Sequence, residues 1–382
     1  MIPGFTSTGS KRPDALFGDQ AGVPHRMVRA KGCRVWDTEG REYLDTTMAL
    51  GAVSLGYGHP AVAEAATAAI ADGVVGPLAP DREERLADRL GELIPGLEAV
   101  RFLKTGAEAV AAAVRIARVQ TGRERIVTCG YQGWLDLFSD AAGVPQGARD
   151  VRCEIPFNDV AALHEACSTE PVAAIVVEPV VDAAPSDEWV AAINETRERS
   201  GAVLVLDEIK TGIRLGWGGA GRRYGFRGDL IVLGKALGNG FPIAAVGGAA
   251  DLMEAATRTW ISSTLATEFV ALAAAEAVLN TYERENVAAH LTNVGERFYR
   301  GLEKIVSEYG EVTKAVRGIA EFGYLECVDD ETSAVLAAKC AAKGLIFKRN
   351  AYNFVSLAHQ ETVIDDVLQR VGDAVDEMAR ST

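Results

Sequence analysis

Along most of the chain, short apolar runs alternate with longer segments in which apolar residues recur with helical spacing. Six runs of five or six residues, rich in Val, Ile and Leu, predict buried strands at residues 99–103, 125–129, 150–155, 173–178, 202–207 and 230–234. Helices are predicted at residues 59–73, 81–94, 107–120, 158–167 and 187–200. Because uniformly apolar strands that alternate with helices are typical of a mostly parallel sheet covered by helices, the sequence predicts an α/β fold.

A different pattern begins after about residue 262. One long helical stretch, two sets of short alternating segments and a last helix follow at residues 268–305, 316–328, 353–359 and 362–380. Near the N-terminus, residues 32–45 have the pattern of two strands around a turn at Thr38-Glu39-Gly40. These segments predict a smaller α+β domain that uses both ends of the chain.

We therefore expect three parts along the sequence. Residues 1–58 form an N-terminal segment that belongs to the small domain, residues 59–262 form a large α/β domain, and residues 263–382 form the C-terminal small α+β domain. The length of 382 residues is sufficient for two domains and a large core.

Composition narrows the class of protein. Apolar residues make up 48% and charged residues 24% of the chain, as in soluble globular proteins. The net charge of −14 argues against a nucleic-acid partner or an anionic membrane, because both attract basic surfaces. No run approaches the roughly 18 apolar residues that span a bilayer, and the six cysteines form no C-x-x-C pair. We expect a cytoplasmic protein with reduced thiols.

Three ionisable residues stand at the ends of successive predicted strands. Glu178 and Asp207 are 29 residues apart, and Asp207 and Lys235 are 28 residues apart, each about the length of one βαβ unit. Taken singly, each would be a charged residue at a solvated strand end. Because the carboxyl ends of parallel strands face one crevice, the three together predict a site.

This set of residues suits one cofactor. A desolvated lysine becomes a good amine nucleophile, and a buried aspartate can hold a cationic heterocycle. Pyridoxal phosphate needs both, because a lysine carries it as a Schiff base and a carboxylate keeps its pyridine nitrogen protonated.

Gly106 and Ala107 open a helix directly after a predicted strand, which favours a phosphate site. Tyr131 follows the next strand, where its ring can stack on a flat cofactor. By themselves, that turn would be an ordinary strand-to-helix connection and Tyr131 a core aromatic.

One literal motif is rejected. The letters GWGGAG at residues 216–221 fit G-x-G-x-x-G, but a dinucleotide loop directly joins a strand to a helix. Here the match lies beyond the strand end at Asp207 and precedes RRYGFRGD, in which we expect no helix. We interpret the segment as a glycine-rich surface loop.

The stretches VLVLDEIKTGIR (residues 203–214) and GDLIVLGKALGNGFPIAAVGG (residues 228–248) resemble the signature of class III pyridoxal-phosphate aminotransferases, in particular the glutamate-1-semialdehyde aminomutase subgroup. Further matching motifs are YLD…LGYGHP, KTGAEA, GYQGW, VVEP and STLATEFVALAAAEA, in the family order. The resemblance implies a fold type I pyridoxal-phosphate transferase that forms a homodimer, with active sites at the subunit interface.

The resemblance also implies a role for each matching residue. Lys235 would form the Schiff base and carry the proton, and Asp207 would pair with the pyridine nitrogen. Ile209 would cover the ring face opposite Tyr131, and Glu178 would lie near the cofactor hydroxyl.

Four further residues match positions that contact the cofactor. Gly106 and Ala107 would donate backbone N–H groups to the phosphate, although Ala107 replaces the Ser or Thr that is common in the family. Thr264 would reach the phosphate of the partner subunit's cofactor. Gln132 replaces a common histidine, so that its polar contact is altered.

The substrate region departs from the aminomutase pattern. Leu50 and its neighbours replace the tryptophan-bearing segment that lines the aminomutase pocket, residues 180–186 lack the usual glycine, and KRNAYNFVSLAH at residues 348–359 replaces a carboxylate-bearing stretch. Candidate partners for a substrate carboxylate are Lys11, Arg12 and Arg349, each of which is otherwise a surface charge.

We therefore expect an aminotransferase that works by ping-pong Schiff-base chemistry on small-molecule amines and keto or aldehyde acceptors. The alternative within the fold is an aminomutase, or a racemase or decarboxylase that shares the cofactor and breaks a different bond. The alternative outside catalysis is a protein that keeps the fold for binding or assembly, which the combination of Lys235, Asp207 and Glu178 argues against.

Overall fold

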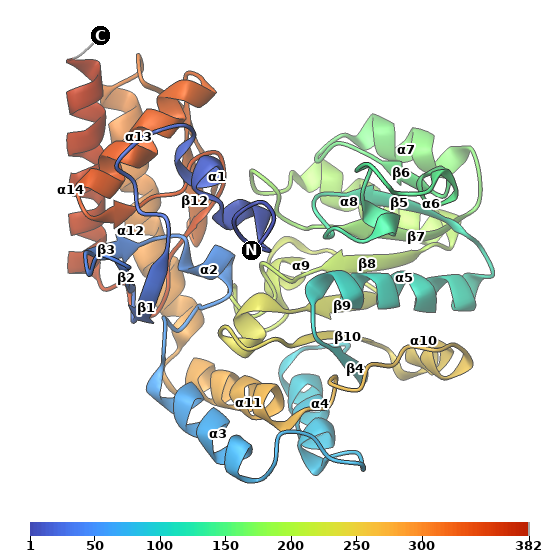
Figure 1. The fold of residues 1–382 in the computed structure, drawn as a ribbon. Helices are drawn as coiled ribbons and strands as arrows, with labels where there is room; N and C mark the ends of the chain where they lie inside the picture. Colours follow the sequence, from blue (N-terminus) through green and yellow to red (C-terminus); the bar gives the residue numbers. More distant parts are fainter. Residues whose placement is uncertain (381–382) are drawn as a thin grey trace. The chain divides into compact units, whose positions relative to one another are not determined.

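The computed structural model describes residues 1–380, which fold into two compact units (Figure 1). The larger unit comprises Ala61–Glu285, and the smaller unit combines Met1–Pro60 with Asn286–Thr382. As the sequence pattern predicts, a mostly parallel sheet covered by helices is accompanied by a smaller α+β part.

A seven-stranded sheet forms the centre of the larger unit, in the order β4-β10-β9-β8-β7-β5-β6. The strands are β4 (Ala99–Leu103), β5 (Arg125–Cys129), β6 (Arg152–Glu154), β7 (Val172–Val177), β8 (Val203–Asp207), β9 (Leu230–Leu233) and β10 (Ala244–Gly248). Only β10, which the apolar pattern did not single out, runs antiparallel to its neighbours β4 and β9. The carboxyl ends of the other six strands therefore lie at one edge of the sheet.

Helices cover both faces of this sheet (Figure 1). The alanine-rich α5 (Gly106–Thr121) packs against residues such as Val176 and Val205 on one face. The helices α7 (Val160–Ser168) and α8 (Asp187–Ser200) pack against the alternate residues, such as Ile175 and Leu204, on the other. Successive side chains of a strand point to opposite faces of the sheet. Because helices cover both faces, both sets of side chains are apolar, and the strands appear in the sequence as continuous apolar runs.

The remaining helical segments of the larger unit surround this core. They are α3 (Pro60–Ala71), α4 (Asp81–Leu93), η2 (Asp136–Phe138), α6 (Gln146–Asp150), α9 (Gly219–Tyr224), η3 (Lys235–Gly238), α10 (Ala250–Met253), η4 (Glu254–Arg258) and α11 (Phe269–Arg284). The sequence placed α11 in the C-terminal domain, but it packs on α4 and η3 and so belongs to the larger unit by contact. The single long helix expected over 268–305 is divided, because Asn286 takes a left-handed φ of 46° before α12 (Val287–Glu308).

The smaller unit contains two sheets. One has the order β1-β2-β3-β13 and comprises β1 (Met27–Lys31), β2 (Arg34–Asp37), β3 (Glu42–Asp45) and β13 (Leu345–Ile346). The other has the order β11-β12-β14 and comprises β11 (Thr313–Ile319), β12 (Phe322–Cys327) and β14 (Asn353–Phe354). The remaining elements are η1 (Gly9–Lys11), α1 (Pro13–Phe17), α2 (Met48–Gly51), α12, α13 (Asp330–Ala342) and α14 (Glu361–Ala379). The predicted turn at Thr38-Glu39-Gly40 does join the antiparallel pair β2 and β3.

The glycine-rich segment at 216–221 is only partly a surface loop, because its first three residues are half-buried and its last three are buried. It wraps around the carboxylate of Glu208, which accepts N–H groups from Ala220, at 3.0 Å, and Gly221. A Cβ at Gly219 would lie 2.2 Å from Glu208 Oε2, which explains the glycine. The helix α9 begins at Gly219, within this segment, and runs to Tyr224, where no helix was expected. It is still no dinucleotide loop, because it does not directly join β8 to a helix.

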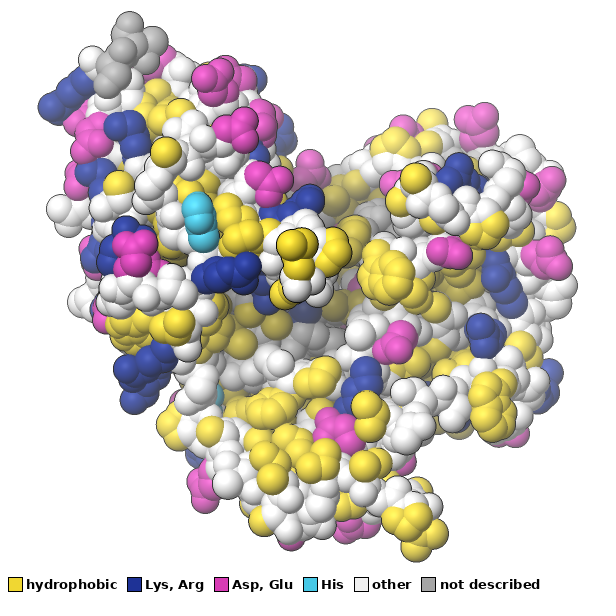
Figure 2. Space-filling model, viewed as in Figure 1, with side chains coloured by type: hydrophobic (Ala, Val, Ile, Leu, Met, Phe, Trp, Pro, Cys, Tyr) yellow, Lys and Arg dark blue, Asp and Glu magenta, His cyan; other side chains and the backbone are white. Residues whose placement is uncertain are grey.

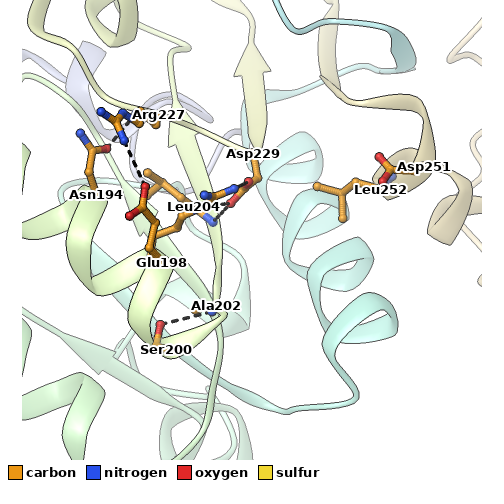
Figure 3. A network of polar contacts seen from close by, with 10 residues as sticks. Asn194, Glu198, Ser200, Ala202, Leu204, Arg227, Asp229, Asp251 and Leu252 are labelled. Carbon is orange, nitrogen blue, oxygen red and sulfur yellow. Dashed lines mark hydrogen bonds and ion pairs between the residues drawn. The ribbon is translucent and has the colours of Figure 1, made fainter.

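A polar network fixes α8 to the amino-terminal edge of the sheet (Figure 3). Asp229, just before β9, accepts the Leu204 amide at 2.8 Å and the Arg197 Nε at 2.9 Å. Arg197 also donates a second hydrogen bond to the other carboxylate oxygen of Asp229. Nearby, Arg227 pairs with Glu198 at 3.1 Å, but both of these side chains are largely exposed. One side chain thus joins a helix and two strands at the edge opposite the carboxyl ends.

On the surface shown in Figure 2, acidic and basic side chains are intermixed, with apolar side chains between them. No helix within residues 1–380 is both long enough and apolar enough to cross a bilayer.

We expect Asp229→Ala to lower the free energy of unfolding by about 2 kcal/mol, because it removes a bidentate charged pair and leaves a buried amide without its acceptor. The matched control is Arg227→Ala in the same network, which removes an exposed pair worth less than about 0.5 kcal/mol. Urea unfolding followed by circular dichroism measures both variants. Equal losses for the two would contradict a central role of Asp229.

Candidate functional site

The carboxyl ends of five parallel strands bring the predicted chemistry to one edge of the larger unit. Lys104 follows β4, Gly130 follows β5, Glu178 follows β7, Asp207 ends β8, and Gly234 and Lys235 follow β9. In the β7–β8 register, Val177 lies opposite Leu206, so Glu178 and Asp207 are neighbours across the strands. The three ionisable residues that the spacing argument singled out therefore follow or end strands at this one edge.

Lys235 stands at the start of η3 in an unusual backbone conformation. Its φ is 42°, in the left-handed region, which costs a residue other than glycine about 1 to 2 kcal/mol. The side chain as a whole is half-buried. Burial lowers the pKa of its amine, and the positive charge of Lys210 lowers it further, while Glu178 and Asp207 act in the opposite direction. A lysine held in this way is a good candidate for an amine nucleophile.

Asp207 is 3% exposed at the end of β8. Burial, and next the negative charge of Glu178, raise the pKa of its carboxyl to about 7. The Ile209 amide donates to Asp207 Oδ1 at 3.1 Å. Within residues 1–380 no donor is recorded for Oδ2, so this oxygen can take a hydrogen bond from a cationic ligand.

Glu178 already has protein partners. Its Oε1 lies 2.6 Å from the Nζ of Lys210, and both side chains are buried. Its Oε2 accepts the Tyr131 amide at 3.1 Å. A Cβ at Gly130 would lie 2.6 Å from Glu178 Cβ, so only glycine allows this close approach.

Sequence reasoning missed two buried cations of this cluster, Lys210 and Arg214. Lys210 is 5% exposed and Arg214 is 0% exposed, and both act electrostatically on Lys235. The available signal was the density of charges in DEIKTGIR, which directly follows an apolar strand and contains a glycine. Charges in such a turn are buried when the turn folds back on the sheet.

The amino terminus of α5 offers backbone donors at the same edge. Thr105 caps the helix by accepting the Glu108 amide, and Glu108 accepts the Thr105 amide in return. This capping box satisfies two amides of the first turn and leaves those of Gly106 and Ala107 for another acceptor. Gly106 lies against Ile209, because a Cβ there would be 2.5 Å from Ile209 Cδ1. The helix start and the residue after Asp207 are therefore in contact.

The turn after β5 places Tyr131 and Gln132 differently. Tyr131 is 73% exposed, and Gln132 is buried, with its Nε2 donating to the Cys129 carbonyl at 2.8 Å. Gly133 approaches Ala107 so closely that a Cβ would lie 2.6 Å from the Ala107 side chain. The turn thus packs on the start of α5, while the side-chain amide of Gln132 bonds to the backbone of the same turn.

Thr264 belongs to the larger unit, and the three candidate substrate residues belong to the smaller unit. Thr264 is exposed on the segment that precedes α11. In the smaller unit, Lys11 and Arg12 are exposed, and Lys11 lines a cavity of about 470 Å³ together with Asp45 and other residues.

Arg349 is held in place within the smaller unit. Its guanidinium bonds to Asp330 Oδ1 at 2.8 Å and to the backbone carbonyls of Asp14 at 3.1 Å and Ala15 at 3.4 Å. These contacts join α1 and α13, so its geometry has a structural explanation.

The segment around Leu50 is strained. Met48, Ala49 and Leu50 all have positive φ, from 45° to 60°. Asp45 holds the turn by accepting the Met48 amide at 3.1 Å and the Tyr57 hydroxyl at 2.6 Å, and the Tyr57 oxygen accepts the Ala49 amide at 2.9 Å. Such a run persists only where surrounding contacts determine it.

The groups at the strand-end edge fit pyridoxal phosphate. This cofactor needs an amine for its aldehyde carbon, a carboxylate for its pyridine nitrogen, donors for its phosphate and an apolar surface for its ring. Lys235, Asp207, the amides of Gly106 and Ala107, and Ile209 are of these kinds and meet at one edge. The observation that fits best is Oδ2 of Asp207, for which the described residues provide no hydrogen-bond donor.

Comparisons with known proteins agree with this chemistry. The sequence pattern of the family described as aminotransferase class-III matches residues 18–137 and 140–378. The glutamate-1-semialdehyde 2,1-aminomutase of Aquifex aeolicus (strain VF5) is 31% identical over 99% of this chain and 97% of its own length. The enzyme of the same name from Thermomicrobium roseum is 31% identical, over 98% of this chain and 96% of its own.

Solved structures share the fold. The PLP internal aldimine form of the FumI protein of Sphingopyxis sp. MTA144 has a TM-score of 0.93 at 25% identity, over 100% of this chain and 94% of that one. Acetylornithine aminotransferase from Elizabethkingia anophelis has a TM-score of 0.83 at 25% identity, over 94% and 96%. The chain belongs to the class III aminotransferases, pyridoxal-phosphate-dependent enzymes of fold type I.

Proposed function

We propose that this enzyme is an aminotransferase that moves an amino group from an amino donor to a keto or aldehyde acceptor in two ping-pong half-reactions. The observation that carries the proposal is the surroundings of Lys235. Its amine has a lowered pKa and lies near Asp207 and Glu178 at the edge where the start of α5 also offers free amides. A lowered pKa makes the neutral amine more available, and a neutral amine can bond to a carbonyl carbon and can also accept a proton.

In this proposal the chain would hold the cofactor at three of its groups. Lys235 Nζ would hold its aldehyde carbon, and Asp207 Oδ2 would hold its protonated pyridine nitrogen. The amides of Gly106 and Ala107 bind its phosphate. When bound, pyridoxal phosphate supplies an electron sink that stabilises negative charge on the substrate carbon. As a general base, Lys235 Nζ would accept the proton from that carbon.

The other matched residues complete the proposed site. Ile209 packs on one ring face and Tyr131 on the other, and Glu178 orders the turn that contains Tyr131. Gln132 would contribute through the backbone that it braces. We keep Lys11 and Arg12 as proposed partners of a substrate carboxylate. Arg349 suits that role less, because Asp330 already engages its guanidinium.

An aminomutase is the second candidate. It is supported by the names of the relatives with 31% identity, which are glutamate-1-semialdehyde 2,1-aminomutases. The same lysine and aspartate would serve it, and the amino group would move within one carbon skeleton. The changed segment around Leu50 favours the aminotransferase.

We also propose a cytoplasmic location, on the basis of the reduced thiols that the sequence indicates.

Isotope transfer tests the reaction. A panel of amines and amino acids is first screened for loss of the cofactor's visible absorption, and the active donor is then supplied with ¹⁵N together with pyruvate or 2-oxoglutarate. We expect ¹⁵N in newly formed alanine or glutamate by mass spectrometry. Label that stays in an isomer of the donor would establish the aminomutase instead, and no reaction with any amine would favour a binding protein.

Lys235→Ala tests the site. We expect loss of transfer by more than about a thousandfold, because general base and nucleophile are removed together. In the wild-type protein, borohydride reduction should leave a pyridoxyl group on the Lys235 peptide, and in the variant on none. Asp207→Asn is the matched comparison: it should keep the label and bind cofactor, yet react slowly. A pyridoxyl group on another lysine of the wild-type protein would refute the assignment.

We further propose a homodimer in which Thr264 binds the phosphate of the partner's cofactor. Support comes from exposed apolar side chains on the same segment, Trp260 at 80% and Leu265 at 52%. Tyr131 and Trp134 of the larger unit are also exposed, at 73% and 75%. Large exposed apolar side chains mark interaction surfaces, and a second copy of the chain would cover them.

Subunit mixing tests this arrangement. Thr264→Glu should block cofactor binding by repelling the phosphate, and Lys235→Ala lacks the amine, so each homodimer is inactive. Statistical re-association should restore about a quarter of the wild-type activity, because half of the dimers then contain one complete site. Mixing Lys235→Ala with Asp207→Ala is the control, since both changes fall in the same subunit's site. Absence of recovery, with exchange verified by mass spectrometry, would contradict a role across the interface.

A further inference from the structure

Two carboxylates and three cations cluster around the carboxyl ends of β7, β8 and β9. Glu178 follows β7, Asp207 ends β8, Lys210 and Arg214 belong to the turn after β8, and Lys235 follows β9. Interactions between charges are strong in a site of low dielectric constant, so the pairing within this cluster decides which group carries its charge.

The two carboxylates have different partners. Glu178 is bonded at both oxygens, to Lys210 Nζ at 2.6 Å and to the Tyr131 amide at 3.1 Å. Asp207 accepts the Ile209 amide at one oxygen. The buried ion pair with Lys210 balances the charge of Glu178. Of the two carboxylates, only Asp207 has an oxygen, Oδ2, to which no described residue donates a hydrogen bond.

We propose that Lys210 is a positioning residue: its ion pair with Glu178 withholds that carboxylate from Lys235 and leaves Asp207 to balance the charge of the bound cofactor. This inference rests on the proposed role of Lys235 as the catalytic amine. Lys210 acts through Glu178 and through its own charge, and it takes no part in the bond changes.

The electrostatic consequence has a definite sign. Groups that act on the Lys235 amine are Lys210 and Arg214, which disfavour its protonation, and Glu178 and Asp207, which favour it. Loss of Lys210 removes a repelling cation and also frees Glu178 to attract a proton to Lys235. Both changes raise the pKa of Lys235. Loss of the Glu178 charge leaves Lys210 unbalanced and lowers the pKa of Lys235.

Amine reactivity of the cofactor-free full-length chain measures this directly. Reductive methylation over a range of pH, followed by peptide mass spectrometry, gives the titration midpoint of Lys235. For Lys210→Met we expect a midpoint higher by about one unit or more, hence about tenfold slower labelling below the midpoint. For Glu178→Gln we expect a shift in the opposite direction, and the double variant should lie near the wild type.

Two controls separate charge from structure. Lys210→Arg keeps the cation and should keep the midpoint of Lys235. Lys343→Met removes a lysine that pairs with Glu377 at 2.6 Å in the smaller unit, and it should leave the Lys235 midpoint unchanged. In the loaded enzyme, the pH optimum of kcat should move upward for Lys210→Met and not for Lys210→Arg. A purely structural role would lower activity at every pH without moving the optimum.

The inference is overturned if Lys210→Met and Glu178→Gln shift the midpoint in the same direction, or if neither shifts it while circular dichroism shows folded protein. If Lys210→Met does not fold, Glu178→Gln must still lower the midpoint and Lys210→Arg must preserve it, and failure of either rejects the proposal. The midpoints are read without turnover, so they are independent of whether the enzyme transfers amino groups. Loss of that function would appear in the isotope experiment alone.

Discussion

The site depends on keeping an ammonium-forming lysine, Lys235, at a buried edge of the sheet. Burial of an unpaired charge costs several kcal/mol, and a chain avoids this cost by pairing the group or by neutralising it. Here both solutions are present: Lys210 is paired with Glu178, and the pKa of Lys235 is lowered. The parallel strands make this possible, because they end at the same edge, where β7, β8 and β9 bring Glu178, Asp207 and Lys235.

Close backbone approaches hold this cluster together. Gly106 admits Ile209 to the start of α5, and Gly130 admits Glu178 to the turn after β5. A side chain at Gly106 would clash with Ile209, and one at Gly130 would clash with Glu178, so either would separate the packed elements. Lys235 also has a left-handed φ, at the point where the chain turns from β9 into η3. Backbone strain of this kind is typical of functional sites.

Much of this was predictable from the sequence, and the failures have physical causes. The strands of the sheet interior and the meeting of Glu178, Asp207 and Lys235 followed from apolar runs and their spacing. The strand β10 was missed because AAVGG has the small residues of a loop. The break at Asn286 was missed because the helical periodicity continues on both sides of one left-handed residue. The glycine-rich segment was misjudged because its fold is set by Glu208, a contact that no local pattern contains.

The Lys210–Glu178 pair is informative because stability does not explain it. Replacement of a buried ion pair by apolar residues of similar volume is often neutral or stabilising, so a fold under selection for stability alone has no reason to keep one. The pair lies beside the lysine and the aspartate on which the proposed chemistry depends, and its partner Glu178 also fixes the turn that contains Tyr131. A cation at position 210 therefore changes the charge balance of the site without occupying it. Such a charge acts on the protonation of Lys235 from one step away, directly and through its pairing with Glu178.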